Sequence, residues 1–163
     1  MRAVASTSWA IAHFLHFLGF AWAFGASVAI HRLVGLAEQH TAAQKAGLEI
    51  GARKLVLGGE LAGLGNAILG GIIALVDNPV HLKPAQSGAG PWLHVKLAVV
   101  LILLVVAHLR MFKLARLVRE RAGGASEADC DALLNGAKTF GWIDLTAYGV
   151  VFFLATFRFV LFN

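Results

Sequence analysis

The sequence predicts an all-α protein, an integral membrane four-helix bundle. Hydrophobic residues make up 58% of the 163 residues and charged residues only 14%, whereas a soluble domain carries about 25% charged residues. A membrane-spanning helix needs about 20 mainly apolar residues, and the chain contains four such stretches. We therefore expect a single transmembrane domain over residues 1–163, with no soluble module.

The four apolar stretches are expected as spans in chain order. The first is too long for a cleaved signal peptide and contains histidines, so it is interpreted as a retained helix. Glycines such as Gly59 and Gly63 in the second span allow close helix packing and leave space for a flat macrocycle. The spans are expected at about residues 9–34, 55–76, 92–112 and 139–162.

Basic residues are concentrated in two of the expected loops, 37–54 and 113–138. In a four-span protein these two loops lie on the same side of the membrane. The positive-inside rule then places both loops in the cytoplasm and both termini in the periplasm of a bacterial inner membrane. The net charge of +5 is thus interpreted as a topology signal, and no nucleic-acid partner is expected. The basic residues of these loops and their borders are Arg32, Lys45, Arg53, Lys54, Lys113, Arg116, Arg119, Arg121 and Lys138.

The segment between the third and fourth spans carries signals for helix ends. The pair Gly123-Gly124 is expected to end the third helix. Ser126 followed by Asp129 is typical of a helix cap, here of a short interfacial helix. The single cysteine, Cys130, is expected in this polar loop, and its solitary state excludes an internal disulfide.

Histidines within the first and third spans are candidate metal ligands. The first span contains His13, His16 and His31, and the third contains His94 and His108. An imidazole in lipid costs free energy unless it is hydrogen-bonded or ligated, which makes each a functional candidate. The pair in the third span and the pair His16 and His31 are separated by fourteen and fifteen residues. Each pair therefore lies on roughly one helix face, about 21–23 Å apart.

These spacings predict two levels of axial ligands for haem b. Because the first and third spans run in the same direction, His16 is expected to meet His94, and His31 to meet His108. Neutral imidazole is an accepted haem ligand, so one haem b is expected at the first pair and a second is left open. His13 competes with His16 for the outer position. The structural alternative is that each histidine only hydrogen-bonds a neighbouring helix.

Cations near the histidines are candidate partners of the haem propionates. Lys96 and Arg158 are expected near the outer level, and Arg32, Arg110 and Lys113 near the inner level. Lysine and arginine form charge-assisted hydrogen bonds to carboxylates. The alternative is that they extend their charged ends to the interface.

Two carboxylates lie within the expected spans, Glu60 in the second and Asp144 in the fourth. An acid at this depth needs a partner, and the candidates are Arg32, Arg110 and His108. Either a structural ion pair or proton delivery to a redox site, including a hydrogen bond to a ligating histidine, fits these positions.

One segment resembles the third span of the HemJ-type protoporphyrinogen oxidases. Residues 91–97, Pro-Trp-Leu-His-Val-Lys-Leu, are similar to the start of that span and lead through an apolar run to His108. The closing Phe-Arg-Phe at 157–159 is weakly similar to the end of those proteins. The copper-resistance D-like membrane proteins share the first-span histidine and tryptophan-glycine pattern. The first span is also similar to the HemJ-type oxidases, and this similarity rests on His16, Trp22, Gly25, Arg32 and Leu33.

The resemblance implies a four-helix membrane protein that binds haem b, with His16 and Lys96 central to oxidase activity. The expected function is therefore redox, either oxidation of a porphyrinogen or quinol or electron transfer without catalysis. The alternatives are a haem sensor or carrier and a copper-binding or copper-transport protein. Expected partners are membrane lipid, a porphyrin or quinone-like small molecule and a redox protein, with a homo-oligomer left open.

Overall fold

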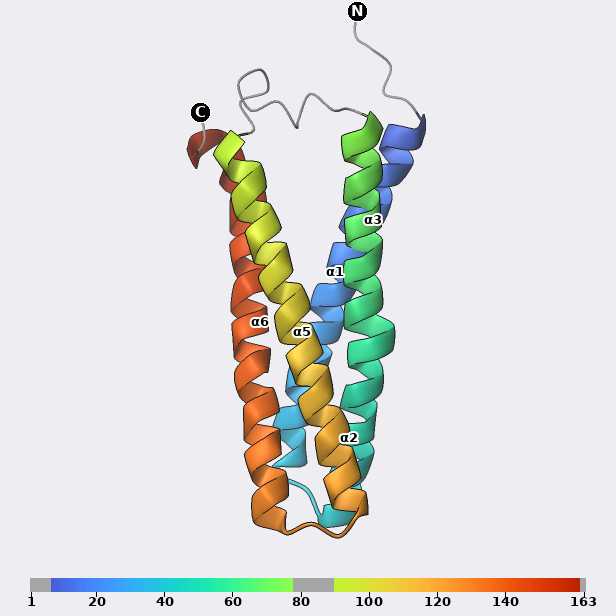
Figure 1. The fold of residues 1–163 in the computed structure, drawn as a ribbon, viewed down its shortest axis with the longest axis vertical. Helices are drawn as coiled ribbons and strands as arrows, with labels where there is room; N and C mark the ends of the chain where they lie inside the picture. The colour runs from blue at the N-terminus through green and yellow to red at the C-terminus, as the bar shows by residue number, and fades with distance from the viewer. Residues whose placement is uncertain (1–6, 78–89, 162–163) are drawn as a thin grey trace, which may run out of the picture.

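The computed structural model describes residues 7–77 and 90–161, drawn as a ribbon in Figure 1. The side chains of residues 42, 90–92 and 157–161 lie outside the description. Within the described ranges the chain is helical nearly throughout and contains no strand, which confirms the predicted all-α four-helix bundle. The elements are α1 (Thr7–Ala37), α2 (Ala42–Leu55), the π-helical turn η1 (Val56–Leu61), α3 (Ala62–Asp77), α5 (Gly90–Ala122) and α6 (Glu127–Leu161).

Four helical rods are long and apolar enough to cross a membrane, because α2, η1 and α3 follow one another without a break. Large apolar side chains such as Phe14, Phe17, Leu101 and Phe112 are more than 60% exposed on the outside of the bundle. A surface of this kind needs a lipid environment. The chain is therefore a multi-pass membrane protein.

Two predicted loops are much shorter than expected. Residues 37–54 were expected as a loop, but α2 begins at Ala42, directly after a capping box between Thr41 and Gln44. Residues 113–138 were also expected as a loop, but α5 continues to Ala122 and α6 begins at Glu127. The helices extend past the apolar stretches because their ends are capped and joined by ion pairs, so polar composition does not end them here.

The turn between α5 and α6 follows the predicted signals. Gly124 has a φ of +78°, which a glycine adopts without a steric penalty. The Oγ of Ser126 accepts a hydrogen bond from the backbone N–H of Asp129 at 3.2 Å, as a helix cap does. α6 then runs on as one continuous helix, so the short separate helix does not exist. Cys130 is fully buried on this helix, which corrects its expected position in a loop.

Glycines hold α1 against α3, as their spacing predicts. A Cβ atom added at Gly63 would lie 2.6 Å from the backbone nitrogen of Ala23. At Gly70 it would lie 2.6 Å from the carbonyl oxygen of Ala12. The two backbones are therefore in direct contact, as small residues permit in membrane helices.

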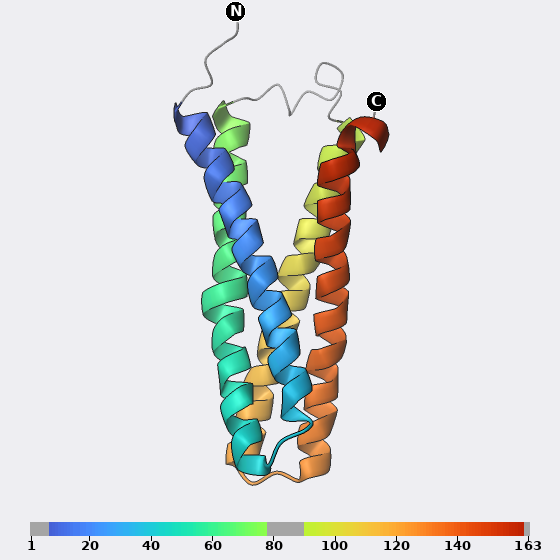
Figure 2. The ribbon, with the colours of Figure 1, turned by 180° about the vertical axis from the view of Figure 1, so that it is seen from behind.

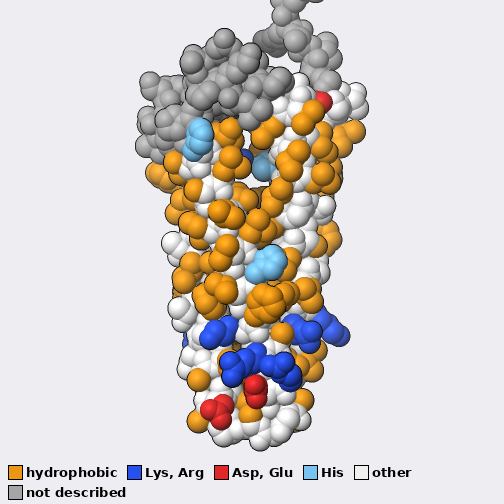
Figure 3. Space-filling model, in the orientation of Figure 1, with side chains coloured by type: hydrophobic (Ala, Val, Ile, Leu, Met, Phe, Trp, Pro, Cys, Tyr) orange, Lys and Arg blue, Asp and Glu red, His pale blue; other side chains and the backbone are white. Residues whose placement is uncertain are grey.

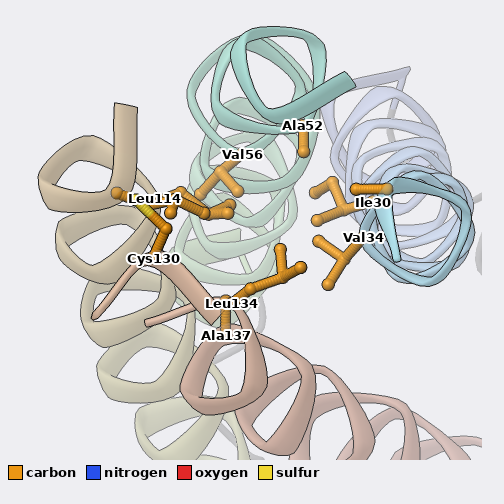
Figure 4. Packing of buried hydrophobic residues seen from close by; sticks show 10 residues of the cluster. Ile30, Val34, Ala52, Val56, Leu114, Cys130, Leu134 and Ala137 are labelled. Atoms are coloured by element: carbon orange, nitrogen blue, oxygen red, sulfur yellow. The ribbon is translucent and has the colours of Figure 1, made fainter. Parts of the chain in front are cut away.

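The bundle is closed at one end and divided at the other. Figures 1 and 2 show that α1 with α3, and α5 with α6, separate toward the end that carries the termini. At the opposite end α1, α2, η1, α5 and α6 converge on one apolar cluster (Figure 4). We call this the closed-end cluster. Its residues are Ile30, Val34, Ala37, Ala52, Val56, Leu114, Leu117, Cys130, Leu134 and Ala137.

Candidate cofactor cleft and buried charge cluster

A cleft of about 210 Å³ lies where the two helix pairs diverge. Figure 3 shows the hollow on the face formed by α3 and α5, with a histidine and a cationic side chain inside it. Most of its wall is aliphatic. The lining comes from α1 (His13, His16, Phe20), α3 (Leu64, Ala67, Ile68, Gly71, Ile72, Ala74, Leu75) and α5 (Leu93, Lys96, Leu97, Val100).

The His16 imidazole is fixed at both nitrogens. Its Nδ1 lies 2.5 Å from the carbonyl oxygen of Ala67, which only accepts, so Nδ1 carries the proton. The other nitrogen, Nε2, then accepts a hydrogen bond from Nζ of Lys96 at 2.9 Å. Gly71 leaves room for the ring, since a Cβ there would lie 3.3 Å from Nδ1. His16 and Lys96, which the family resemblance singled out, are thus in direct contact across the cleft.

His94 does not share this position, contrary to the expected pair with His16. It is exposed and is not among the residues that line the cleft. The reason is rotation along α5, because residues two positions apart point about 200° away from each other. Lys96 faces the cleft, so His94 must face outward. The structure therefore brings Lys96, and not His94, to His16.

His13 lies in the same cleft, one helical turn from His16. Its Nδ1 donates to the backbone oxygen of Trp9 at 2.9 Å, and its ring stacks on the Trp9 ring with centroids 3.9 Å apart. The cleft therefore contains two imidazoles, both from α1. His16 is the one held between two other helices.

His31 and His108 are not brought together as the second pair. The His31 ring packs edge-on against Trp142 of α6, with centroids 4.6 Å apart. His108 is exposed, and its Nδ1 donates to the carbonyl of Leu104 on its own helix at 2.7 Å. The rotation argument applies again, because Arg110 points inward and His108 therefore points outward. The expected second haem site has no support in this arrangement.

The other expected propionate partners are not at the cleft. Arg110 is fully buried elsewhere in the bundle, and Arg32 is exposed. Lys113 lies against Gly136 of α6. The side chain of Arg158 lies outside the described residues. Among the described cations, Lys96 alone lines the cleft.

Arg110 forms a separate, fully buried charge cluster, with one member from each of four elements. Its Nη2 contacts Oδ2 of Asp144 at 2.8 Å and is also paired with Oε2 of Glu60. Ser27 of α1 accepts from the same nitrogen at 3.3 Å and donates to Asp144 Oδ2 at 3.0 Å. Of the three candidate partners, Arg32, Arg110 and His108, it is Arg110 that pairs with both acids. Tyr148 of α6 is also fully buried, and its ring packs edge-on against Phe20 and Phe24.

The sequence did not single out Ser27 or Tyr148, because neither residue type is unusual in an apolar span. Both residues are buried where helices pack together, and the spacing of residues along one helix does not predict contacts of this kind. Glu60 belongs to the π-helical turn η1, in which it is buried. The neighbouring residue Gly59 packs against Ala26 of α1. π-Helical turns are frequent at functional sites.

Comparison with known proteins finds no matching protein-family model, no matching curated protein and no matching solved structure. The cleft and the charge cluster are therefore interpreted from their own geometry.

The donor set of the cleft fits a haem better than a bare metal ion. Among the described residues, no group of three or more histidine, cysteine, aspartate or glutamate side chains is placed to hold a metal. A bare copper ion draws all its ligands from the protein, whereas a haem macrocycle supplies the equatorial nitrogens and needs only axial ligands. His16 provides one such nitrogen within aliphatic walls, and Lys96 provides a cation beside it.

Proposed function

We propose that this protein is a haem b-binding redox protein of the membrane that oxidises a lipid-soluble donor, such as a porphyrinogen or a quinol, and passes the electrons to a redox partner protein. The observation that supports the proposal is the His16 imidazole. Its Nδ1 is held by the Ala67 carbonyl and its Nε2 faces the cleft. A neutral imidazole with one nitrogen fixed by a hydrogen bond is the form in which histidine binds a metal.

The residues of the cleft have distinct roles in this proposal. His16 would hold the haem iron through Nε2, and the haem would supply one-electron transfer. Lys96 would then bind a carboxylate of the tetrapyrrole or of the substrate through a charge-assisted hydrogen bond. The aliphatic residues of α3 and α5 receive the flat apolar ring. The resemblance of residues 91–97 to the HemJ-type oxidases supports the same two residues, His16 and Lys96.

The distribution of charge supports an orientation in the bacterial inner membrane. Lysine and arginine side chains form a belt near the closed end of the bundle in Figure 3. The positive-inside rule then puts the closed end in the cytoplasm, and the cleft with both termini toward the periplasm. Reporter fusions at the C-terminus and in the α5–α6 turn test this orientation, because each reporter is active on one side only.

An absorption spectrum of the purified protein is the first test. We expect a Soret band and a content of one haem per chain. The His16→Ala variant should lose the pigment, whereas His94→Ala and His108→Ala should keep it, because both of those rings are exposed. These two variants are matched controls, since each also removes one imidazole.

Other outcomes of this test would overturn the proposal. A colourless protein that binds stoichiometric copper would favour the copper alternative. Loss of pigment in His94→Ala equal to that in His16→Ala would restore the original axial pair and contradict the described geometry. Two haems per chain would require a second site outside the cleft.

An anaerobic assay separates catalysis from electron transfer alone. Wild-type protein is mixed with protoporphyrinogen or a quinol and an added redox dye as electron acceptor, and product formation is followed by fluorescence or absorbance. We expect Lys96→Met to retain pigment but to lose most of the oxidation rate. A pigmented wild-type protein that oxidises neither donor would instead be a carrier or a sensor.

A further inference from the structure

The Arg110 cluster contains more negative than positive charge if all its groups are ionised. Glu60 and Asp144 carry two carboxylates, and among the described residues Arg110 is the one cation that contacts them. All three side chains are 0% exposed. An uncompensated charge in the interior of a membrane protein is costly, and buried acids commonly become neutral instead.

The cluster also contains several buried polar atoms that lack a hydrogen-bond partner. These include Oε1 of Glu60, Oδ1 of Asp144 and the hydroxyl of Tyr148. The carboxyl groups of Glu60 and Asp144 both contact the same nitrogen of Arg110, so they lie close to each other. A hydrogen on one acid can therefore reach an acceptor that is now unpartnered. Buried polar groups are rarely left without a partner.

The two acids differ in how well their negative charge is supported. Oδ2 of Asp144 accepts hydrogen bonds from both Arg110 and Ser27. Glu60 has Arg110 as its one hydrogen-bond donor in the described structure. Donors stabilise the ionised form of an acid, so Asp144 is the better carboxylate and Glu60 the better carboxylic acid.

A proton fits this position better than a metal cation. The guanidinium of Arg110 already lies between the two acids, and a sodium ion placed there would be repelled by it. A proton adds no volume and removes one charge. It also gives Glu60 an O–H donor, which a metal ion does not supply.

We propose that the cluster of Arg110, Glu60 and Asp144 is a proton-binding site in which Glu60 holds one proton in the resting protein. The site is distinct from the haem cleft, since Lys96 and Arg110 are fourteen residues apart on α5, about 21 Å. A second apolar cluster, which includes Leu64, Leu103 and Tyr148, lies near the Arg110 cluster. The proposal does not depend on haem binding.

The groups that face this site come from every element packed around it. His31 is the nearest further titratable group from α1, because a Cβ at Gly141 would lie 2.9 Å from its Nδ1 and 3.5 Å from Nη1 of Arg110. That Nδ1 is also buried without a partner. The full set is Ser27 and His31 of α1, Glu60 of η1, Arg110 of α5, and Asp144 and Tyr148 of α6.

Infrared spectroscopy of the wild-type protein tests the proposal directly. We expect the C=O band of a protonated, buried carboxyl group at neutral pH. Labelling all glutamates with carbon-13 should move the band, and labelling all aspartates should leave it in place. Absence of the band, or its movement with the aspartate label, would overturn the proposal. This measurement does not depend on whether any variant folds.

Variants then identify the residue. Glu60→Gln should remove the band and leave the thermal stability in detergent close to that of wild type, because glutamine resembles the neutral acid. Glu49→Gln is the matched control, since Glu49 is also buried but its two carboxylate oxygens accept hydrogen bonds from Arg121. The band should persist in Glu49→Gln. A band that persists in Glu60→Gln would refute the assignment.

Discussion

The two ends of the bundle differ in what joins the helices. At the closed end five elements share the closed-end cluster, and ion pairs such as Arg121 with Glu49 connect α5 to α2. At the divided end α1 contacts α3 and α5 contacts α6, and the cleft lies between the pairs. Glycine contacts hold α1 against α3, whereas apolar packing and ion pairs hold one helix pair to the other.

This difference indicates that different residues pack the helices within a pair and hold one helix pair against the other. Small residues such as Gly63 and Gly70 set the distance within one pair. The Arg110 cluster joins members of both pairs near the level where they begin to diverge. The cleft can then remain open without loss of the whole bundle. The following variants test this division, from the largest expected effect to the smallest.

Arg110→Met should have the largest effect on stability. It leaves Glu60 and Asp144 buried without their shared cation, and removal of one partner of a buried ion pair costs about 3–5 kcal/mol. Reversible unfolding in mixed micelles measures the loss. Arg116→Met is the control, because Arg116 is an exposed residue on the same helix. A loss below about 1 kcal/mol would show that the cluster does not join the helix pairs.

Glu49→Gln should weaken the closed end by about 1.5–3 kcal/mol, the value of hydrogen bonds to a charged group. The carboxylate of Glu49 is 1% exposed and accepts from Nε and Nη2 of Arg121 at 2.8 and 2.9 Å. The same unfolding experiment measures the effect. Pigment in the cleft should be retained, and its loss would contradict the separation of the two ends.

Gly63→Ala should separate α1 from α3 and cost about 1–3 kcal/mol, because the added methyl group meets backbone atoms. Gly65→Ala is the matched control on the same helix, since nothing lies within 4 Å of its Cβ position. That control should gain up to about 1 kcal/mol from helix propensity. Equal behaviour of the two variants in the unfolding experiment would refute the described helix contact.

Lys138→Met should have the smallest effect, within about 0–1 kcal/mol, as is typical of exposed ion pairs. The Nζ of Lys138 lies 2.8 Å from Oε2 of Glu38, and both side chains are 36% exposed. The difference from wild type should shrink further as salt is added. A larger loss of unfolding free energy that does not depend on salt would show that this ion pair contributes to holding the helices together at the closed end.

The four spans were predictable because composition alone separates lipid-embedded helices from their surroundings. The predicted loops were too long because α2, the end of α5 and the start of α6 contain many polar residues, which hydropathy assigns to loops. Their end signals were nevertheless present, for example at Thr41 and Ser126. Where a cap and an ion pair support a helix beyond the bilayer, hydropathy does not mark its end.

The candidate site was only partly predictable. Spacing along one helix identified His94 and His108 as a pair on one face, but it did not show which face points inward. Lys96 and Arg110 each lie two residues further along, so they occupy the opposite face. The rotation of α5 follows from the partners of Arg110 on other helices. The sequence contained part of this signal, since Glu60 in the second span and Asp144 in the fourth each need a partner and Arg110 was among the candidates.

The cleft opens sideways between α3 and α5, on a face that is otherwise covered with apolar side chains (Figure 3). A ligand that enters by this route arrives through the hydrocarbon of a single leaflet. Its occupancy is then set by its concentration in that leaflet, not by its concentration in water. Apparent affinity in detergent should consequently fall as micelles are added and dilute the ligand, and a fixed lipid composition is needed to compare variants.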